Sequence, residues 1–278
     1  EVDTLVFDIQ DIGARYYTYV STMRLAMEAA AEHGKSFVVL DRPNPINGVD
    51  VDGPMLDPGR ESFVASHRLP VRHGMTIGEL AKMFVAELKL EIDLQVVAVE
   101  GWQRADVLDL TGLPWVNPSP NIRCLNQAIL YPGIGLLETT NLSVGRGTDT
   151  PFERFGAPWI NAVELAMRLN AQNLAGIRFT PIRFSPETSV FANQECQGVQ
   201  LSITNRQKLS PLDVGLVIAT TLRTMYPNDW QVEKYDRLLG NAQVLEAVRS
   251  GATLAQIRQG FEPDVQAFRT RRAAYLLY

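Results

Sequence analysis

The sequence has 278 residues, of which 46% are hydrophobic and 21% charged, a composition typical of a globular protein with a sizeable core. Its formal net charge is -5, which argues against a nucleic-acid partner because duplex binding requires a dense cationic surface. No run approaches 18 apolar residues, so the sequence predicts no membrane-spanning segment.

The sequence begins at Glu1 instead of Met, and a strand-like pattern starts almost at once. We interpret this start as the result of a removed N-terminal piece or as a fragment, and no signal peptide is visible. The two cysteines, Cys124 and Cys196, lie far apart and lack metal-ligand spacing. We expect two buried free thiols and not a disulfide.

The first 40 residues predict a strand, a helix and a second strand. Residues 4–9 are apolar except at Asp8, which indicates a strand buried on both faces. A helical pattern over residues 15–32 closes at His33-Gly34, and residues 36–40 form another buried strand. Such a βαβ unit predicts a sheet that is at least partly parallel.

A long segment rich in Pro, Gly and Asp follows at residues 41–73, and loops of this length are often functional. Thr76 and Glu79 match a capping box that begins the next helix. Residues 94–99 indicate a third strand. Residues 111–155 are irregular, with one moderately helical stretch near Asn126.

The composition changes after about residue 148. The later part contains helical patterns at residues 161–173, 211–225 and 241–259 and strand patterns at 177–184 and 198–204. We therefore predict an α/β protein in which a Rossmann-like, mainly parallel domain (residues 1–148) is followed by a smaller α+β domain (residues 149–278).

Polar clusters follow the first two predicted strands, where open parallel sheets bind their ligands. Carboxylate, amide and guanidinium groups of this kind grip sugar rings and carboxylates. Asp8 has the alternative role of capping the following helix, and Arg15 that of a structural ion pair. The candidate residues of these two clusters are Asp8, Asp11, Arg15, Tyr17, Arg42 and Asn44.

Two further clusters lie in the irregular region, where prolines and short polar side chains suit a rigid polar pocket. His73 is another candidate ligand, although lone histidines are more often structural. Trp102, Trp115 and Trp159 either stack on sugars or, as is more usual for a single Trp, pack in the core. The cluster residues are Asn117, Asn121, Glu138, Asn141, Arg146 and Glu153.

Nucleotide and metal motifs are absent from the sequence: it contains no G-x-G-x-x-G, P-loop, H-E-x-x-H or C-x-x-C pattern. G-x-S-x-G, the nucleophile motif of many hydrolases, is absent too. We therefore expect no cofactor and no metal. The remaining carboxylates, amides and arginines are the inventory of enzymes that protonate a leaving group unaided.

Several ordered motifs resemble the NamZ-type exo-β-N-acetylmuramidases, and the resemblance extends over essentially the whole chain. The motifs are FDIQDIGARYYTY, LDRPNP, RHGMTIGELA, GLPWVNPSPN, ETTNLSVGRGT and PFERFGAPW, with ECQGVQL and AAYLLY near the end.

This resemblance implies hydrolysis of β-linked N-acetylmuramic acid from the non-reducing end of peptidoglycan fragments, without a cofactor. It also implies a periplasmic or extracellular location. Members of the family carry a further N-terminal stretch with a Gly-Pro-Glu-His-Gly motif, whose glutamate is the leading candidate for the catalytic acid. Relative to the family, the chain thus looks N-terminally incomplete, and we expect it to be poorly stable alone, dimeric, or paired with a separate N-terminal segment.

Within this chain, Glu138 is the best candidate for the catalytic acid, followed by Asp8 and Asp11. Arg15, Arg42 and Arg146 are candidates to pair with the lactyl carboxylate that distinguishes muramic acid from glucosamine. The main alternative is a non-catalytic muropeptide- or glycan-binding protein that has lost the acid. An amidase is a weaker alternative, because the sequence shows neither metal ligands nor a nucleophile motif.

Overall fold

The computed structural model describes residues 2–278, which form two compact units. Unit 1 contains the chain up to Pro118 together with Glu262–Tyr278, and unit 2 is Ser119–Phe261. This division falls earlier than the boundary at residue 148 that the composition suggested. The irregular segment after Pro118 belongs to unit 2 because its helix packs against a helix from the second half of the chain.

Unit 1 is built around a parallel sheet with the strand order β1-β2-β5. An antiparallel pair, β3 and β4, lies within the segment that the sequence described as one long loop. The elements of unit 1 are β1 (Thr4–Phe7), α1 (Tyr19–Glu32), β2 (Ser36–Leu40), β3 (Asp52–Met55), β4 (Pro70–Arg72), α2 (Ile77–Leu88), β5 (Leu94–Val97) and the later part of α8 (Leu254–Arg272).

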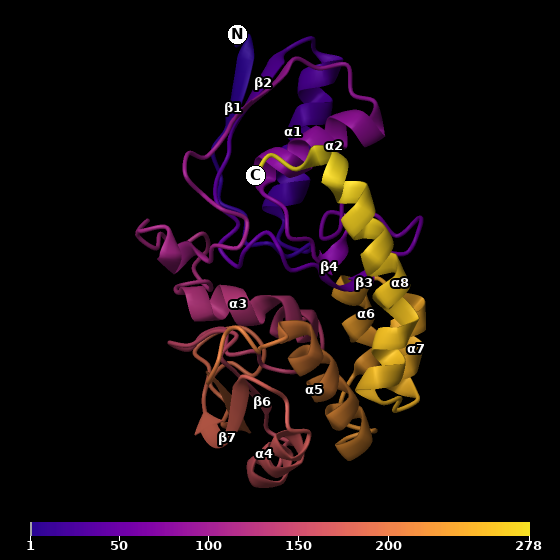
Figure 1. Cartoon of the computed structure of the whole chain (residues 1–278). Coiled ribbons are helices and arrows are strands. Elements are labelled where there is room, and N and C mark those ends of the chain that lie inside the picture. The colour runs from indigo at the N-terminus through magenta and orange to yellow at the C-terminus, as the bar shows by residue number, and fades with distance from the viewer. Residues whose placement is uncertain (1) are drawn as a thin grey trace. The chain divides into compact units, whose positions relative to one another are not determined.

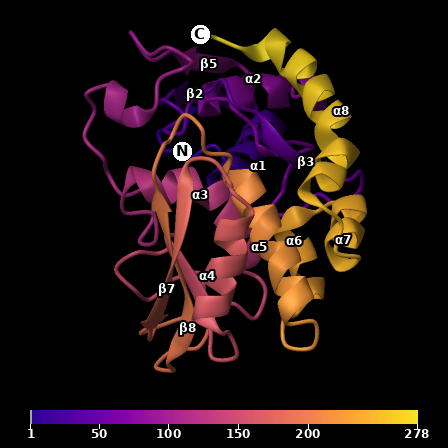
Figure 2. The same cartoon turned by 60° about the horizontal axis from the view of Figure 1, so that its bottom comes forward.

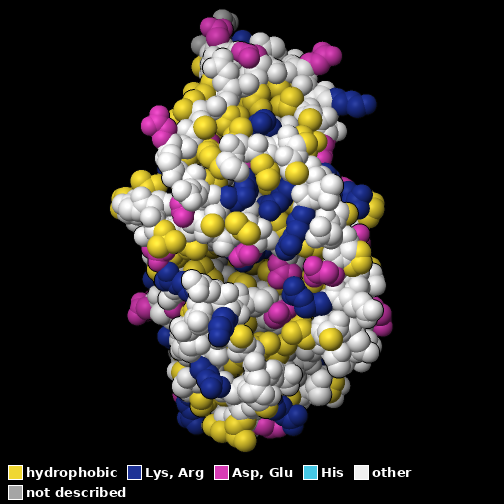
Figure 3. Space-filling view, viewed as in Figure 1, with side chains coloured by type: hydrophobic (Ala, Val, Ile, Leu, Met, Phe, Trp, Pro, Cys, Tyr) yellow, Lys and Arg dark blue, Asp and Glu magenta, His cyan; other side chains and the backbone are white. Residues whose placement is uncertain are grey.

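Helices α1 and α2 pack against each other and against β2, so they cover the same face of the sheet (Figure 1). Phe37 and Val39 point to this face and are fully buried. On the opposite face, Val6 is 61% exposed and Val97 54% exposed. Apolar side chains accordingly gather on the surface around β1 and β2 (Figure 3).

The prediction that the first strand is buried on both faces is therefore wrong for residues 2–278. In the described chain β1 is an edge strand, paired only with β2, and helices cover one of its faces. A continuous apolar run reports the hydrophobicity of both faces of a strand, but it contains no information about the layers that cover them.

Unit 2 combines an antiparallel sheet, in the order β6-β8-β7, with helices (Figure 2). Helix α4 packs on β7 and β8, and α3 packs on α5. The elements are α3 (Leu125–Ile134), β6 (Arg154–Ala157), α4 (Ala162–Ala171), β7 (Ile177–Phe184), β8 (Cys196–Ile203), α5 (Pro211–Met225), α6 (Asp236–Leu239), α7 (Ala242–Arg249) and the start of α8.

Glycines make the close packing of α3 on α5 possible. A Cβ atom on Gly215 would lie 2.5 Å from the carbonyl oxygen of Gly133, and one on Gly133 would collide with the carbonyl oxygen of Pro211. Side chains at these two positions would force the helices apart. The crossing thus fixes the position of the segment that follows α3, which carries Glu138 and Arg146.

Several sequence predictions are confirmed. Strands β2 and β7 and helix α5 have the predicted bounds, and α2 begins with the predicted capping box between Thr76 and Glu79. The predicted helix over residues 241–259 is two helices, α7 and α8, because Gly251 between them has a φ of 71°. Both cysteines are free thiols, as expected, but only Cys196 is buried, whereas Cys124 is half-buried.

None of the helices in residues 2–278 combines the length and the apolar character needed to cross a bilayer. Within the same residues, the His, Cys, Asp and Glu side chains form no group of three or more that could hold a metal ion.

The two faces of the parallel sheet predict different responses to the same substitution. Val39→Ala removes buried methyl groups and should lower the free energy of unfolding by about 2 kcal/mol. Val97→Ala, on the exposed face of the neighbouring strand, should change it by less than about 0.5 kcal/mol. Urea unfolding followed by circular dichroism measures both values. Equal losses would mean that the second face is also buried in solution.

Candidate functional site

A pocket of about 460 Å³ lies at the carboxyl end of the parallel sheet in unit 1. Asp8 and Gln10 follow β1, Arg42 follows β2, and residues 113–118 supply another wall. We call this cavity the strand-end pocket. Its position agrees with the general rule that open parallel sheets bind ligands beyond the carboxyl ends of their strands.

An ion pair between Asp8 and Arg42 joins the ends of the two strands. Nε and Nη2 of Arg42 lie 2.8 and 2.6 Å from Oδ1 of Asp8. The side chain of Asp8 is 47% exposed and that of Arg42 is 41% exposed, so the pair faces the solvent. An exposed pair of this kind adds little stability, and both groups are accessible to a ligand.

Aromatic and amide groups complete the wall of the strand-end pocket. The hydroxyl of Tyr19 donates to the carbonyl of Pro118 (3.3 Å), and Nε1 of Trp115 donates to Oδ1 of Asn117 (3.1 Å). These bonds hold the wall in place and leave the amide nitrogen of Asn117 as a donor for a ligand. An apolar ring face beside polar donors suits a pyranose.

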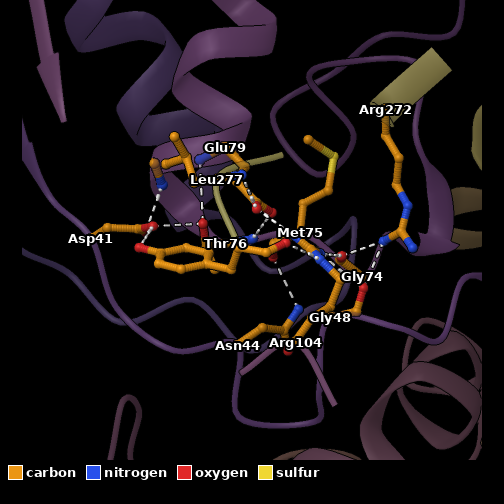
Figure 4. Close-up of polar contacts among 12 residues, drawn as sticks. Asp41, Asn44, Gly48, Gly74, Met75, Thr76, Glu79, Arg104, Arg272 and Leu277 are labelled. Atoms are coloured by element: carbon orange, nitrogen blue, oxygen red, sulfur yellow. Dashed lines mark hydrogen bonds and ion pairs between the residues drawn. The ribbon is translucent and has the colours of Figure 1, made fainter. Parts of the chain in front are cut away.

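Next to the pocket residue Arg42, the buried carboxylate of Asp41 accepts four hydrogen bonds, and Figure 4 shows its contact with Thr76. Oδ1 accepts from the backbone N–H groups of Arg42 (3.0 Å) and Gly78 (2.7 Å). Oδ2 accepts from the hydroxyls of Thr76 (2.7 Å) and Tyr278 (2.8 Å). We call this arrangement the Asp41 network. It connects the end of β2, the start of α2 and the C-terminal residue.

Glu79 forms a second buried centre next to Thr76 (Figure 4). Its Oε2 accepts the Thr76 N–H (3.0 Å) in the capping box, and Oε1 accepts the Leu277 N–H (2.9 Å). The same carboxylate pairs with Arg104. Arg104 and Arg272 both donate to the carbonyls of Gly48 and Gly74. Burial lowers the pKa of Arg272 to about 10.

The structure places other predicted site residues of unit 1 in this buried layer. Asp11 accepts the Gly13 N–H (2.8 Å) and lies 3.3 Å from Nε2 of the fully buried His73. Asn44 donates to the carbonyl of Met75 (3.0 Å). Tyr17 is buried and packs edge-on against the ring of Tyr19. These residues are absent from the lining of the strand-end pocket, and their contacts are with the buried interior of unit 1.

Arg15 is almost completely buried, at 1% exposure. Its Nη1 donates to the backbone carbonyls of Pro54 (3.0 Å) and Leu69 (2.8 Å), and burial lowers its pKa to about 10. This environment favours a structural role, although the partners are carbonyls and not the carboxylates of Asp8 or Asp11 that the sequence suggested.

In unit 2, Glu138 and Arg146 form an ion pair. Nε and Nη2 of Arg146 lie 3.0 and 2.8 Å from Oε2 of Glu138. Burial raises the pKa of Glu138, and the nearby charge of Arg146 opposes this shift without cancelling it. A carboxyl group in this state keeps its proton to higher pH than an ordinary glutamate.

The remaining predicted residues of unit 2 have different surroundings. Asn141 connects two backbone segments, donating to the carbonyl of Asp229 (2.7 Å) and accepting from the N–H of Gln231 (2.8 Å). Glu153 accepts from Nε2 of Gln127 (3.1 Å). Asn121 lines a separate pocket of unit 2.

Sequence reasoning did not select Gln10, Tyr19 or Trp115 for the strand-end pocket. Gln10 lies in the polar cluster after the first strand, and Tyr19 lies just beyond it. Their closeness to this cluster in the sequence is the feature that could have identified them as pocket residues. For Trp115 the sequence leaves sugar stacking and core packing open and favours the core, because a single Trp is usually buried. The neighbouring Val116 is 75% exposed. In an irregular loop the hydrophobicity of the residues does not indicate which side chain lines a cavity.

Comparisons with known proteins agree on one family. Residues 1–126 match the family described as exo-β-N-acetylmuramidase NamZ, N-terminal, and residues 129–278 match its C-terminal counterpart. The chain belongs to the NamZ family. It is 43% identical over 280 residues to the peptidoglycan β-N-acetylmuramidase NamZ of Bacillus subtilis (strain 168), covering all of this chain and 68% of that protein.

Two solved structures of DUF1343 family proteins from Bacteroides fragilis NCTC 9343 have the same fold. The first is 37% identical with a TM-score of 0.92, and the second is 31% identical with a TM-score of 0.80. Each alignment covers 99% of this chain and 75% of the other. The resemblance inferred from the sequence motifs and the predicted α/β fold are thus confirmed.

Asp8 and Asp41 follow neighbouring strands, yet the structure predicts effects of very different size for the same substitution on stability. Asp41→Asn places an amide donor among four donors and should lower the free energy of unfolding by about 2–4 kcal/mol. Asp8→Asn removes an exposed pair and should cost less than about 1 kcal/mol. Thermal and urea unfolding compare the two. A large loss for Asp8→Asn would assign that residue to the fold instead of to a ligand.

Proposed function

We propose that this chain is a glycoside hydrolase that releases N-acetylmuramic acid from the non-reducing end of peptidoglycan fragments. The observation that carries the proposal is the similarity to a peptidoglycan β-N-acetylmuramidase over the entire chain, at 43% identity. Peptidoglycan lies outside the cytoplasmic membrane, so we propose a periplasmic or extracellular location.

Glycoside hydrolysis requires a group that protonates the leaving oxygen and a second group that handles the oxocarbenium-like charge of the transition state. We assign the second role to Asp8. It is the single carboxylate that lines the strand-end pocket within residues 2–278, and Arg42 fixes its orientation through two contacts. Trp115 and Asn117 line the same pocket, and we assign their ring and amide to sugar binding.

Glu138 has the property that a proton donor needs. Its pKa is raised by burial, and a general acid works best when its pKa approaches the working pH. Arg146 limits the rise and holds the carboxyl group in one orientation. We therefore propose Glu138, in unit 2, as a candidate catalytic acid, independently of the assignment of Asp8 in unit 1.

The decisive experiment is turnover of a chromogenic β-N-acetylmuramide, with the matching N-acetylglucosaminide as the comparison substrate. The full chain should hydrolyse the muramide preferentially. Asp8→Asn should reduce kcat/KM by at least about a hundredfold. Asp3→Asn is a matched control at the other end of β1, where the side chain is fully exposed, and it should leave kcat/KM unchanged.

Binding of N-acetylmuramic acid without any turnover would contradict the glycosidase proposal. It would favour the alternative of a non-catalytic glycan-binding protein. A loss of activity in Asp3→Asn equal to that in Asp8→Asn would remove the assignment of Asp8.

The Glu138–Arg146 pair predicts a shift in the pH–rate profile. Activity that depends on protonated Glu138 falls as the pH rises through the raised pKa of this group. Arg146→Met removes the positive charge that lowers this pKa, so the basic limb of the profile should move to higher pH. Arg168→Met, which breaks an exposed pair with Glu164 on α4, is the control and should leave the limb in place.

The measurement is kcat/KM against pH for the three proteins, with thermal unfolding to verify that each variant is folded. A basic limb that stays in place, or moves to lower pH, in Arg146→Met would exclude Glu138 as the proton donor.

A further inference from the structure

The guanidinium groups proposed from the sequence to read a carboxylate all have partners already. Arg15 binds buried backbone carbonyls, Arg42 binds Asp8, and Arg146 binds Glu138. Muramic acid nevertheless carries a carboxylate that glucosamine lacks. A cation without a carboxylate partner of its own is the most direct group to recognise it.

Unit 2 contains a second cavity, of about 720 Å³, whose wall carries three arginines. We call it the arginine pocket, and its charged lining consists of Arg123, Arg154 and Arg183 with the carboxylates of Asp149 and Glu187. Three guanidinium groups face two carboxylates of the lining, and Glu195, 3.7 Å from Arg183, adds a third negative charge close by. Neutral donors of the lining include Asn121, Thr148 and Thr188.

Arg154, the first residue of β6, is the least compensated of the three arginines. It forms no ion pair within residues 2–278, and its Nε is buried without a hydrogen-bond partner there. Its guanidinium lies over the ring of Phe184, with Cζ 5.7 Å from the ring centroid. Desolvation lowers the pKa of Arg154, and the charges of Asp149 and Glu153 only partly oppose this shift.

The other two arginines have weak partners. Arg183 is 70% exposed and lies 3.7 Å from an equally exposed Glu195. Arg123 uses its Nε to bind the carbonyl of Pro120 (2.8 Å), which leaves both terminal nitrogens as donors. An anion that enters the pocket would therefore meet guanidinium N–H donors in a planar arrangement, which matches the geometry of a carboxylate.

The walls of the pocket are held together before any ligand arrives. The N–H of Glu187 donates to the carbonyl of Gly147 (2.8 Å), which joins the loop before β6 to the loop after β7. Gly147 has a φ of 78°, and a Cβ atom there would lie 2.5 Å from the N of Thr188. This close approach fixes the distance between the two loops that carry Thr148 and Thr188.

We propose that the arginine pocket binds a carboxylate of the peptidoglycan fragment and that Arg154 is its main ligand. The inference rests on the proposed function for the identity of the substrate. The carboxylate is either that of the lactyl group of muramic acid or that of a peptide attached to it. Both present the same planar anion to the guanidinium groups.

The test measures dissociation constants by isothermal titration calorimetry for the full chain and its variants. The probes are N-acetylmuramic acid, N-acetylglucosamine and N-acetylmuramyl-L-alanyl-D-isoglutamine, in which the lactyl carboxyl is amidated and the peptide supplies the carboxylate. Arg154→Ala should weaken binding of the probe whose carboxylate enters the pocket at least about tenfold. It should leave the affinity for N-acetylglucosamine unchanged. Arg154→Lys should recover part of the loss, because it keeps the charge without the fork.

The probe whose affinity falls in Arg154→Ala identifies the source of the carboxylate. Loss for N-acetylmuramic acid alone indicates the lactyl group, and loss for the dipeptide derivative alone indicates the peptide. Arg178→Ala is the matched control, because Arg178 is exposed on β7, the strand that also carries Arg183. If Arg154→Ala fails to fold, Arg183→Ala replaces it, with an expected loss of about threefold at a largely exposed position.

Unchanged affinities in both Arg154→Ala and Arg183→Ala, or equal losses in Arg178→Ala, would overturn the proposal. Its failure is distinguishable from failure of the proposed function. Hydrolysis of the muramide by the full chain, with unchanged affinities in these variants, would refute the arginine pocket alone. Binding that depends on Arg154, without hydrolysis, would refute the glycosidase alone.

Discussion

The buried carboxylate of Asp41 is the constraint on which the described site of unit 1 depends. A carboxylate away from water requires hydrogen-bond donors, and four of them surround this one. They come from the end of β2, the first turn of α2 and Tyr278. Gly78 permits the arrangement, because a Cβ atom there would lie 2.8 Å from Cγ of Asp41. The next residue, Arg42, is thereby directed to Asp8 at the edge of the pocket.

Arginine side chains play a second structural role by satisfying the backbone of the long segment between β2 and α2. Irregular segments leave carbonyl groups without ladder partners, and buried ones require donors. Arg15, Arg104 and Arg272 supply these donors from three distant parts of the sequence. The segment between β2 and α2 has little regular secondary structure, yet these hydrogen bonds hold its backbone in a defined conformation.

The candidate site thus separates charged groups by their surroundings. The carboxylate of the Asp41 network, which holds the fold together, is buried and has hydrogen-bond donors on both oxygens. Those proposed to act on a ligand are either exposed, as in the Asp8–Arg42 pair, or incompletely compensated, as at Arg154. Glu138 is intermediate, since burial raises its pKa while Arg146 holds it in place. Stability measurements on the proposed variants distinguish these classes before any activity is measured.

The sequence by itself determined the local elements and the family. Hydrophobic periodicity located β2 and α5, the capping box located the start of α2, and six ordered motifs identified the NamZ resemblance. These features depend on residues close together in the chain, where the period of side chains and the needs of a helix end are visible directly.

Only the tertiary structure decided which of the polar residues face a ligand. Arg15 and Arg42 both follow strands, yet one is buried under backbone carbonyls and the other is 41% exposed. Val6 has the sequence pattern of a core residue, yet it is exposed. Arg154 is not among the candidates predicted from the sequence, yet it lines the arginine pocket. Burial is the sum of contacts from distant segments, and a local pattern contains no record of that sum.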